Sequence, residues 1–204
     1  TYMGTAKILR YIGEQYGLPG TIEEIVFASQ ICQSEGVRYT VEHYRRNRNR
    51  CMGALYWQLN DIWPAISWSS IDCFGKWKPL HYAAKRFYEP IHLSAFINEE
   101  KLMINVSNET LEEFKGKVVV NIKNMDLDVI STKEYDVSVD ELSAESIGEV
   151  KTLKMSDIAL DEIFAECVLY NTRDEKISDC VIVFETPAKL KLKPVKIEVD
   201  IKKK

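Results

Sequence analysis

The first part of the chain carries apolar residues at helical spacing. Residues 5–16 place them every three or four positions, which predicts an amphipathic helix. Residues 22–47 repeat this spacing, and Thr21 with Glu24 forms a capping-box sequence in front of them, so a long helix is expected there. A third helix is expected from Pro79, since proline suits the first turn of a helix.

One short apolar block interrupts this helical pattern. Residues 51–59, CMGALYWQL, lie between a basic segment and a polar loop, and a continuous apolar run of this length is typical of a strand buried on both faces. A long irregular loop is expected from Asn60 to Gly75. Helix, strand, loop and helix together indicate part of an α/β unit, with too few strands to form a sheet alone.

From residue 91 the apolar pattern changes to a period of two, which indicates β-strands. Five segments predict strands clearly and two predict them weakly: 101–109, 116–125, 165–172, 178–185 and 195–201, then 93–98 and 131–139. Short antiparallel strands at this spacing predict an immunoglobulin-like β-sandwich. The expected fold class is therefore α/β followed by all-β, with domains at residues 1–90 and 91–204.

Charge and aromatic content change near the same boundary. Residues 1–92 hold 11 Lys and Arg against 8 Asp and Glu, whereas residues 93–204 hold 16 against 23. Of the aromatic residues, 15 fall in the first part and 6 in the second. This double shift supports two structural units.

The five cysteines form no CxxC pair, and the three histidines do not cluster with them. Free thiols in a reducing compartment are expected, which favours a cytoplasmic location, and neither a metal site nor a cofactor is predicted. The chain shows no leader-like start and no apolar run of about 20 residues, so no membrane partner is expected.

The candidate chemistry lies in the loop that follows the apolar block. All four tryptophans fall between positions 57 and 77. Trp57 is expected at the carboxyl end of the predicted strand, with Asn60 and Asp61 just beyond, which is where α/β folds bind ligands. An indole beside an amide and a carboxylate could hold a sugar ring, so these three residues are the predicted binding residues. Core packing is the alternative for all four tryptophans and the favoured reading for Trp63, Trp68 and Trp77.

Two other functional interpretations are weaker. The four arginines between Arg45 and Arg50 could contact phosphates, but the chain is acidic overall, and a solvated helix end is expected instead, with no nucleic-acid partner. A Ser-His-Asp arrangement could use Ser69 or Ser70 with His81 and Asp72, yet no G-x-S-x-G motif supports it. His81 and His43 are expected to be structural.

A long run of residues resembles a known family. The sequence GALYWQLNDIWP, followed by SWSSID, GKW and LHY, is similar to the β-mannosidase branch of glycoside hydrolase family 2. The resemblance extends more weakly backward through EGVRYTVEHYRRNR and forward through VSNETLEEFKGKVVV and VIVFETPAKLKL. It implies a retaining exo-glycosidase that hydrolyses terminal β-D-mannosides, with a (β/α)8 barrel flanked by immunoglobulin-like domains.

The resemblance also implies what this chain would supply. It corresponds to the C-terminal part of such an enzyme: the last barrel strand with its helices, then one sandwich domain. Trp57 would line the terminal-sugar subsite, with Asn60 and Asp61 as further contacts. The family's two catalytic glutamates lie in Asn-Glu and Ser-Glu-aromatic-Gly motifs at strand ends. Glu35, in the similar SEG sequence, falls within a predicted helix and is not assigned as the nucleophile.

These implications define the expected behaviour of the chain. No catalytic residue is expected within it, so the chain alone should be inactive, and self-association is possible through apolar faces left uncovered. The alternative function is a carbohydrate-binding module that uses the tryptophan-rich loop without hydrolysis.

Overall fold

The computed structural model describes residues 2–151, 159–196 and 198–200 of this chain. Three helices come first in the sequence: α1 (Tyr2–Tyr16), α2 (Ile22–Arg46) and α3 (Pro79–Phe87). All three confirm helices predicted from the apolar spacing. The capping box at the start of α2 is also formed, since Thr21 Oγ1 accepts from Glu24 N at 3.2 Å and Glu24 Oε2 accepts from Thr21 N at 3.2 Å.

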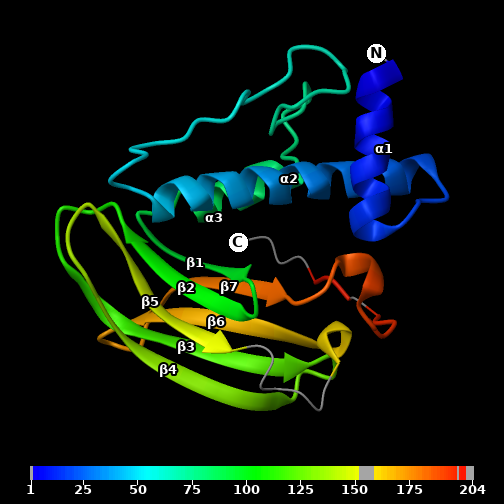
Figure 1. The fold of residues 1–204 in the computed structure, drawn as a ribbon. Coiled ribbons are helices and arrows are strands. Elements are labelled where there is room, and N and C mark those ends of the chain that lie inside the picture. The colour runs from blue at the N-terminus through cyan, green and yellow to red at the C-terminus, as the bar shows by residue number, and fades with distance from the viewer. Residues whose placement is uncertain (1, 152–158, 197, 201–204) are drawn as a thin grey trace.

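The second half forms two antiparallel sheets (Figure 1). The strands are β1 (Ile91–Asn98), β2 (Lys101–Asn108), β3 (Phe114–Asn124), β4 (Val129–Val139), β5 (Ser143–Lys151), β6 (Ile163–Asn171) and β7 (Lys176–Val183). One sheet has the order β1-β2-β5 and the other β4-β3-β6-β7. The two sheets form the expected sandwich. The chain as a whole is mostly β-structure with a few helices.

Two strand predictions differ from the structure. Strand β5 was not predicted, because SAESIGEVK contains few apolar residues and is defined by its antiparallel pairing with β2. A strand was wrongly predicted at residues 195–201, where the described residues are irregular; residues 197 and 201 lie outside the described part. Val195 and Val199 are each 77% exposed, so the alternating pattern there has no described neighbour to pack against.

The core of the sandwich lies between its two sheets. Every strand except β7 contributes buried apolar side chains to this core, and β7 contributes partly buried ones. Across one edge, Tyr135 of β4 donates a hydrogen bond to the carbonyl of Glu149 on β5 at 2.6 Å. Gly148 makes room for that ring, since a Cβ there would lie 2.2 Å from Tyr135 Cε1.

Helix α2 lies along the sandwich against the β1-β2-β5 sheet (Figure 1). A buried charged group on this helix, Glu42, joins the two parts: its carboxylate lies 3.2 Å from His92 Nε2 of β1 and 3.0 Å from Arg38 Nη1. Burial alone would raise the pKa of Glu42, but the His92 hydrogen bond and the charges of Arg38, His92 and Arg46 outweigh it and lower that pKa. The carboxylate is therefore held ionised between the helix and the sheet.

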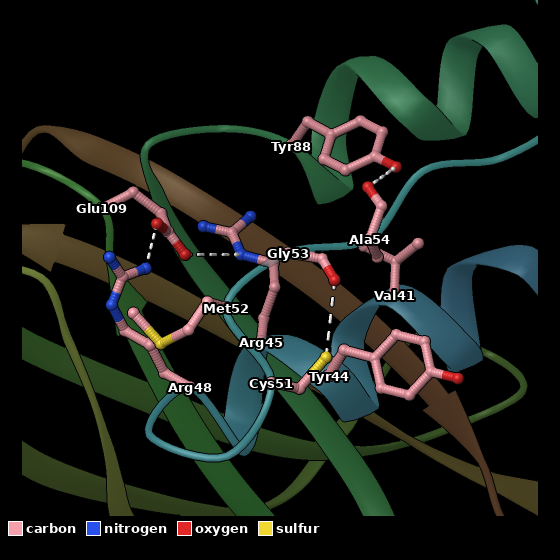
Figure 2. Close-up of a pocket in the computed structure, with 10 residues that line it drawn as sticks. All are labelled: Val41, Tyr44, Arg45, Arg48, Cys51, Met52, Gly53, Ala54, Tyr88 and Glu109. Atoms are coloured by element: carbon pink, nitrogen blue, oxygen red, sulfur yellow. Dashed lines mark hydrogen bonds and ion pairs between the residues drawn. The ribbon is translucent and has the colours of Figure 1, made fainter.

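The basic segment at the end of α2 is only in part the solvated helix end that the sequence predicted, because Arg50 is exposed but Arg45 is buried. The Arg45 side chain is only 9% exposed and donates to the carbonyl oxygens of Phe87 and Glu89, at 2.5 and 2.8 Å. Arg45 and Arg48 also face Glu109 across a small pocket (Figure 2). Arg45 is buried because it donates to carbonyls where the helices meet the sandwich, and Arg48 is partly buried beside Glu109.

The apolar block at residues 51–59 does not form the predicted strand. Its backbone has no regular secondary structure up to Leu59, and Leu55 is fully exposed. A strand buried on both faces requires a hydrogen-bonded neighbour, and the sheets of the described chain lie on the far side of α2 (Figure 1). None of the described helices is both long and apolar enough to cross a bilayer.

Candidate functional site

The loop between α2 and α3 folds into a small hydrogen-bonded unit. Asn60 and Ile71 form a parallel bridge, and Ile71 pairs with Trp77 in the antiparallel sense. Ser70 N donates to the carbonyl of Leu59 at 3.1 Å, and Lys78 N donates to that of Ser70 at 2.8 Å. The loop is therefore closed on itself at its base, directly after the Trp57 position.

Asp61 lies at the centre of this loop and is 9% exposed. Its carboxylate accepts from Ser67 Oγ and Ser69 Oγ, each at 2.6 Å, and from Lys78 Nζ at 3.1 Å. The hydrogen bonds from Ser67 and Ser69, followed by that from Lys78 and its charge, lower the pKa of Asp61 to about 2. Asp61 is thus ionised at neutral pH and holds together two segments of the loop.

A second polar cluster anchors the same loop to α3. Ser70 is fully buried, and its hydroxyl lies 2.9 Å from Tyr56 Oη and 3.0 Å from His81 Nδ1. Trp77 packs edge-on against His81, with ring centroids 4.3 Å apart. Asp72 accepts instead from the backbone N–H groups of a neighbouring turn. Of the Ser-His-Asp alternative, Ser70 and His81 are therefore in contact, whereas Asp72 bonds to backbone groups instead. This arrangement suits a structural role for His81.

The three predicted binding residues lie close in sequence but differ in environment. Trp57 is 74% exposed, and a cis peptide bond joins it to Gln58. Asn60 is exposed and donates from Nδ2 to the carbonyl of Asp61 at 3.3 Å. Asp61 is buried beneath them in the network described above. The structure thus presents Trp57 and Asn60 at the surface and turns the Asp61 carboxylate inward.

The remaining tryptophans are not packed in a core, which was the favoured expectation for them. Trp63 and Trp68 are 63% and 60% exposed, and Trp77, the best packed, is 46% exposed while contacting His81 and Tyr82. The described chain provides no layer above the loop that could cover them. Only Trp77 anchors the loop through its ring.

Sequence reasoning missed the partners of Asp61. Lys78 comes 17 positions later and only meets Asp61 once the loop has closed. A signal was available in the alternation Ser67-Trp68-Ser69, because residues two apart in an extended segment face the same way. Both serines indeed donate to the one carboxylate.

The described residues contain no cluster of three or more His, Cys, Asp or Glu side chains that could hold a metal ion. Glu35 lies within α2, as predicted, and pairs with Arg38 at 2.6 Å. What the loop offers chemically is an exposed aromatic face beside an amide, on a base made rigid by buried polar contacts.

Known proteins share both sequence and fold with this chain. Residues 100–189 match the family described as Mannosidase Ig/CBM-like domain. The β-mannosidase of Capra hircus is 40% identical over 114 residues, which cover 50% of this chain and 13% of that protein. The crystal structure of β-D-mannosidase from Dictyoglomus thermophilum is 33% identical, covers 93% of this chain and 23% of its own, and superposes with a TM-score of 0.84.

This chain is similar to β-mannosidases over most of its length, and residues 100–189 match the Mannosidase Ig/CBM-like domain. β-Mannosidase A of Aspergillus oryzae is a further relative, 33% identical over 138 residues. An exo-chitosanase of Amycolatopsis orientalis shares the fold, with a TM-score of 0.73 at 23% identity over 84% of this chain. The chain spans only 13% and 15% of the length of the goat and Aspergillus relatives.

Proposed function

We propose that this chain is the C-terminal part of a retaining, exo-acting β-mannosidase that hydrolyses terminal β-D-mannosides. The observation that carries this proposal is the likeness to the Dictyoglomus β-D-mannosidase, which extends over 93% of the chain. Carbohydrate is therefore the expected ligand. The two carboxyl groups that a retaining mechanism needs, about 5–5.5 Å apart, belong in this proposal to the rest of the polypeptide.

In the proposed enzyme, residues 1–90 complete a (β/α)8 barrel and residues 91–204 form the sandwich domain behind it. The extended segment 51–59 would be the last barrel strand. Its exposed apolar side chains support this role, because barrel strands are covered on both faces. Met52, Leu55, Leu59 and Trp57 are each at least 56% exposed in this chain. They would be buried only when neighbouring strands and helices are present.

Trp57 would present its indole face to the terminal sugar, at the carboxyl end of that strand. Asn60 beside it can donate or accept a hydrogen bond to a sugar hydroxyl. Asp61 already accepts three hydrogen bonds, two of them at Oδ2, so one further acceptor position remains on Oδ1. Its main contribution in this proposal is to hold the loop in place under Trp57 and Asn60.

The test uses the whole polypeptide that carries this chain, assayed on 4-nitrophenyl β-D-mannoside. Trp57→Ala should lower kcat/KM by about tenfold or more, corresponding to about 1.4 kcal/mol of lost transition-state stabilisation. Trp57→Phe, which keeps an aromatic face, should lose less. Ile66→Ala is the matched control, because Ile66 is a 95% exposed apolar residue of the same loop.

Two outcomes would contradict the proposal. Equal losses for Trp57→Ala and Ile66→Ala would show that loop folding, and not contact with sugar, explains the effect. The second outcome is turnover of the mannoside by residues 1–204 alone, at high protein concentration and with a rate that further purification does not change. It would show that the catalytic pair lies inside this chain.

A further inference from the structure

Two of the five cysteines face each other across adjacent strands of the sandwich. Cys167 of β6 and Cys180 of β7 are direct register partners in an antiparallel pair. Cys167 is fully buried in the core, and Cys180 packs against that core from a partly buried position. Opposite residues in an antiparallel pair project to the same face, with Cβ atoms about 4.5–5.5 Å apart. The two thiols are therefore neighbours inside the sandwich.

The Cα spacing of this arrangement suits a disulfide, which also requires the Cβ atoms to approach to about 3.5–4.5 Å. Directly opposite residues have Cα atoms about 4.5–5.5 Å apart, within the range of about 4.4–6.8 Å that disulfides occupy. Cys167 also raises the pKa of the Cys180 thiol, as a thiol in close contact with it would. The other three cysteines are distributed elsewhere: Cys32 is on α2, and Cys51 and Cys73 are in the loop before α3. The Cys167–Cys180 pair stands apart from them as strand-paired thiols.

We propose that Cys167 and Cys180 form a reversible redox pair that hydrogen peroxide oxidises to a cross-strand disulfide. Cys180 is the first to react, because it is the less buried of the two. Its thiolate attacks one peroxide oxygen, the O–O bond breaks, and the departing hydroxide takes a proton to become water. The product is a sulfenic acid on Cys180.

The second step uses the neighbouring thiol. Cys167 Sγ attacks the sulfenic sulfur of Cys180, the S–O bond breaks, and the hydroxide leaves as a second water with the proton that Cys167 gives up. Two thiols and one hydrogen peroxide thus give one disulfide and two waters. A small-molecule dithiol reverses the reaction by thiol–disulfide exchange.

The surroundings of the pair set its rate. Contact with the Cys167 thiol and burial both raise the pKa of Cys180. Two charged groups of α2 also act on it: Glu42 raises that pKa and Arg38 lowers it. Because the thiolate is the reactive form, oxidation is slow at neutral pH and accelerates as the pH rises. The pair therefore responds to sustained oxidant and not to brief exposure.

The disulfide would secure an edge of the sandwich. Strand β7 is the last strand of its sheet, and its Ser178 hydroxyl accepts from Leu93 N of β1 at 3.1 Å. Linking β7 to β6 closes a hairpin of about 14 residues, and the entropy lost by the unfolded chain favours the folded state. Oxidised protein should unfold at a temperature higher by about 5 °C or more.

The experiment treats folded residues 1–204 with hydrogen peroxide at pH 7 and pH 9, blocks remaining thiols with N-ethylmaleimide, and digests with trypsin without reductant. The expected product is a cross-linked pair of peptides, residues 155–173 and 177–189, which contain Cys167 and Cys180. It should form faster at pH 9, disappear with dithiothreitol, and accompany the rise in unfolding temperature.

Two variants complete the test. Cys180→Ala should abolish the linked peptide and the rise in unfolding temperature, whereas Cys73→Ala should keep both. Sulfinic or sulfonic acid on Cys180 without the link, or links shared equally with Cys51 and Cys73, would overturn the proposal. So would a wild-type link that forms only after the protein has been unfolded.

Discussion

At the scale of single residues, the loop under Trp57 depends on one carboxylate. The Asp61 carboxylate accepts hydrogen bonds from two serine hydroxyls and a lysine ammonium, all from residues that follow it in the chain. Charge-assisted hydrogen bonds of this kind are stronger than neutral ones. The loop therefore owes its shape to an ionised side chain more than to apolar packing.

This leads to a prediction about pH. The folded pKa of Asp61, about 2, lies below its usual value of 3.8, so its contribution to stability is present above about pH 4 and is lost as the pH falls toward 2. Asp61→Asn should unfold more easily than the wild type in urea at pH 6, and the difference should shrink steadily between pH 4 and pH 2.

The control for this prediction is Asp72→Asn, which changes a carboxylate of the same loop that accepts backbone N–H groups. This variant should keep the stability that Asp61 contributes and the pH dependence of that stability. A difference between Asp61→Asn and wild type that stays constant from pH 6 to pH 2 would contradict the role assigned to the ionised carboxylate.

Much of the candidate site follows from the sequence, but not its internal contacts. The tryptophan cluster and its polar neighbours locate the loop, because four tryptophans beside an amide and a carboxylate form a local pattern, but the exposure of Trp63 and Trp68 was not predicted. The Asp61–Lys78 pair is not, since its 17-residue separation becomes a contact only through the bridges at the base of the loop. The burial of Arg45 was missed for a similar reason: its acceptors lie more than 40 residues away.

At the scale of elements, the position of α2 on the sandwich depends on buried charge. The Glu42 side chain is 3% exposed and balances His92 below it and Arg38 and Arg46 beside it. Arg46 also lies over the ring of Phe96 on β1, 4.3 Å from its centroid. The helix therefore has both a hydrogen bond and a cation–π contact with the same strand.

Glu42→Gln should weaken this attachment strongly. It leaves buried cations without their carboxylate, and breaking a buried ion pair on one side costs about 3–5 kcal/mol. The free energy of unfolding, measured with urea at neutral pH, should fall by about that amount, and α2 amides should exchange faster with solvent.

Glu35→Gln is the matched control, because Glu35 pairs with the same Arg38 from a side chain that is 50% exposed. Exposed pairs contribute about 0–1 kcal/mol, so this change should have little effect. Similar losses for the two variants would indicate that α2 is held by its apolar contacts and not by the buried carboxylate.

The elements themselves were largely predictable where one period dominates. The helices show clear 3.6-residue spacing, and β2, β3, β6 and β7 are rich in apolar residues. Strand β5 and the segments 51–59 and 195–201 show the limit. Strand β5 exists because β2 pairs with it, whereas the other two have strand-like sequences and no partner among the described residues.

At the scale of the whole molecule, the chain has one self-sufficient unit and one that is incomplete. The sandwich encloses its own core, while the helical part leaves large apolar side chains uncovered, among them Leu55, Ile62, Trp63 and Phe74. Exposed apolar surface of this extent marks an interface. In the proposed enzyme, the remainder of the barrel covers it.

This asymmetry predicts where backbone amides are protected when residues 1–204 are studied alone. Amides of β3 and β6, paired on both sides within the larger sheet, should exchange slowest. Amides of residues 52–57 should exchange orders of magnitude faster, because they have no strand partner. Hydrogen–deuterium exchange with mass spectrometry provides the measurement.

In the whole polypeptide the same residues should become as protected as β3, since barrel strands on both sides would then pair with them. Strong protection of residues 52–57 in the isolated chain, at concentrations where it is monomeric, would refute the idea that this segment is a barrel strand lacking its neighbours.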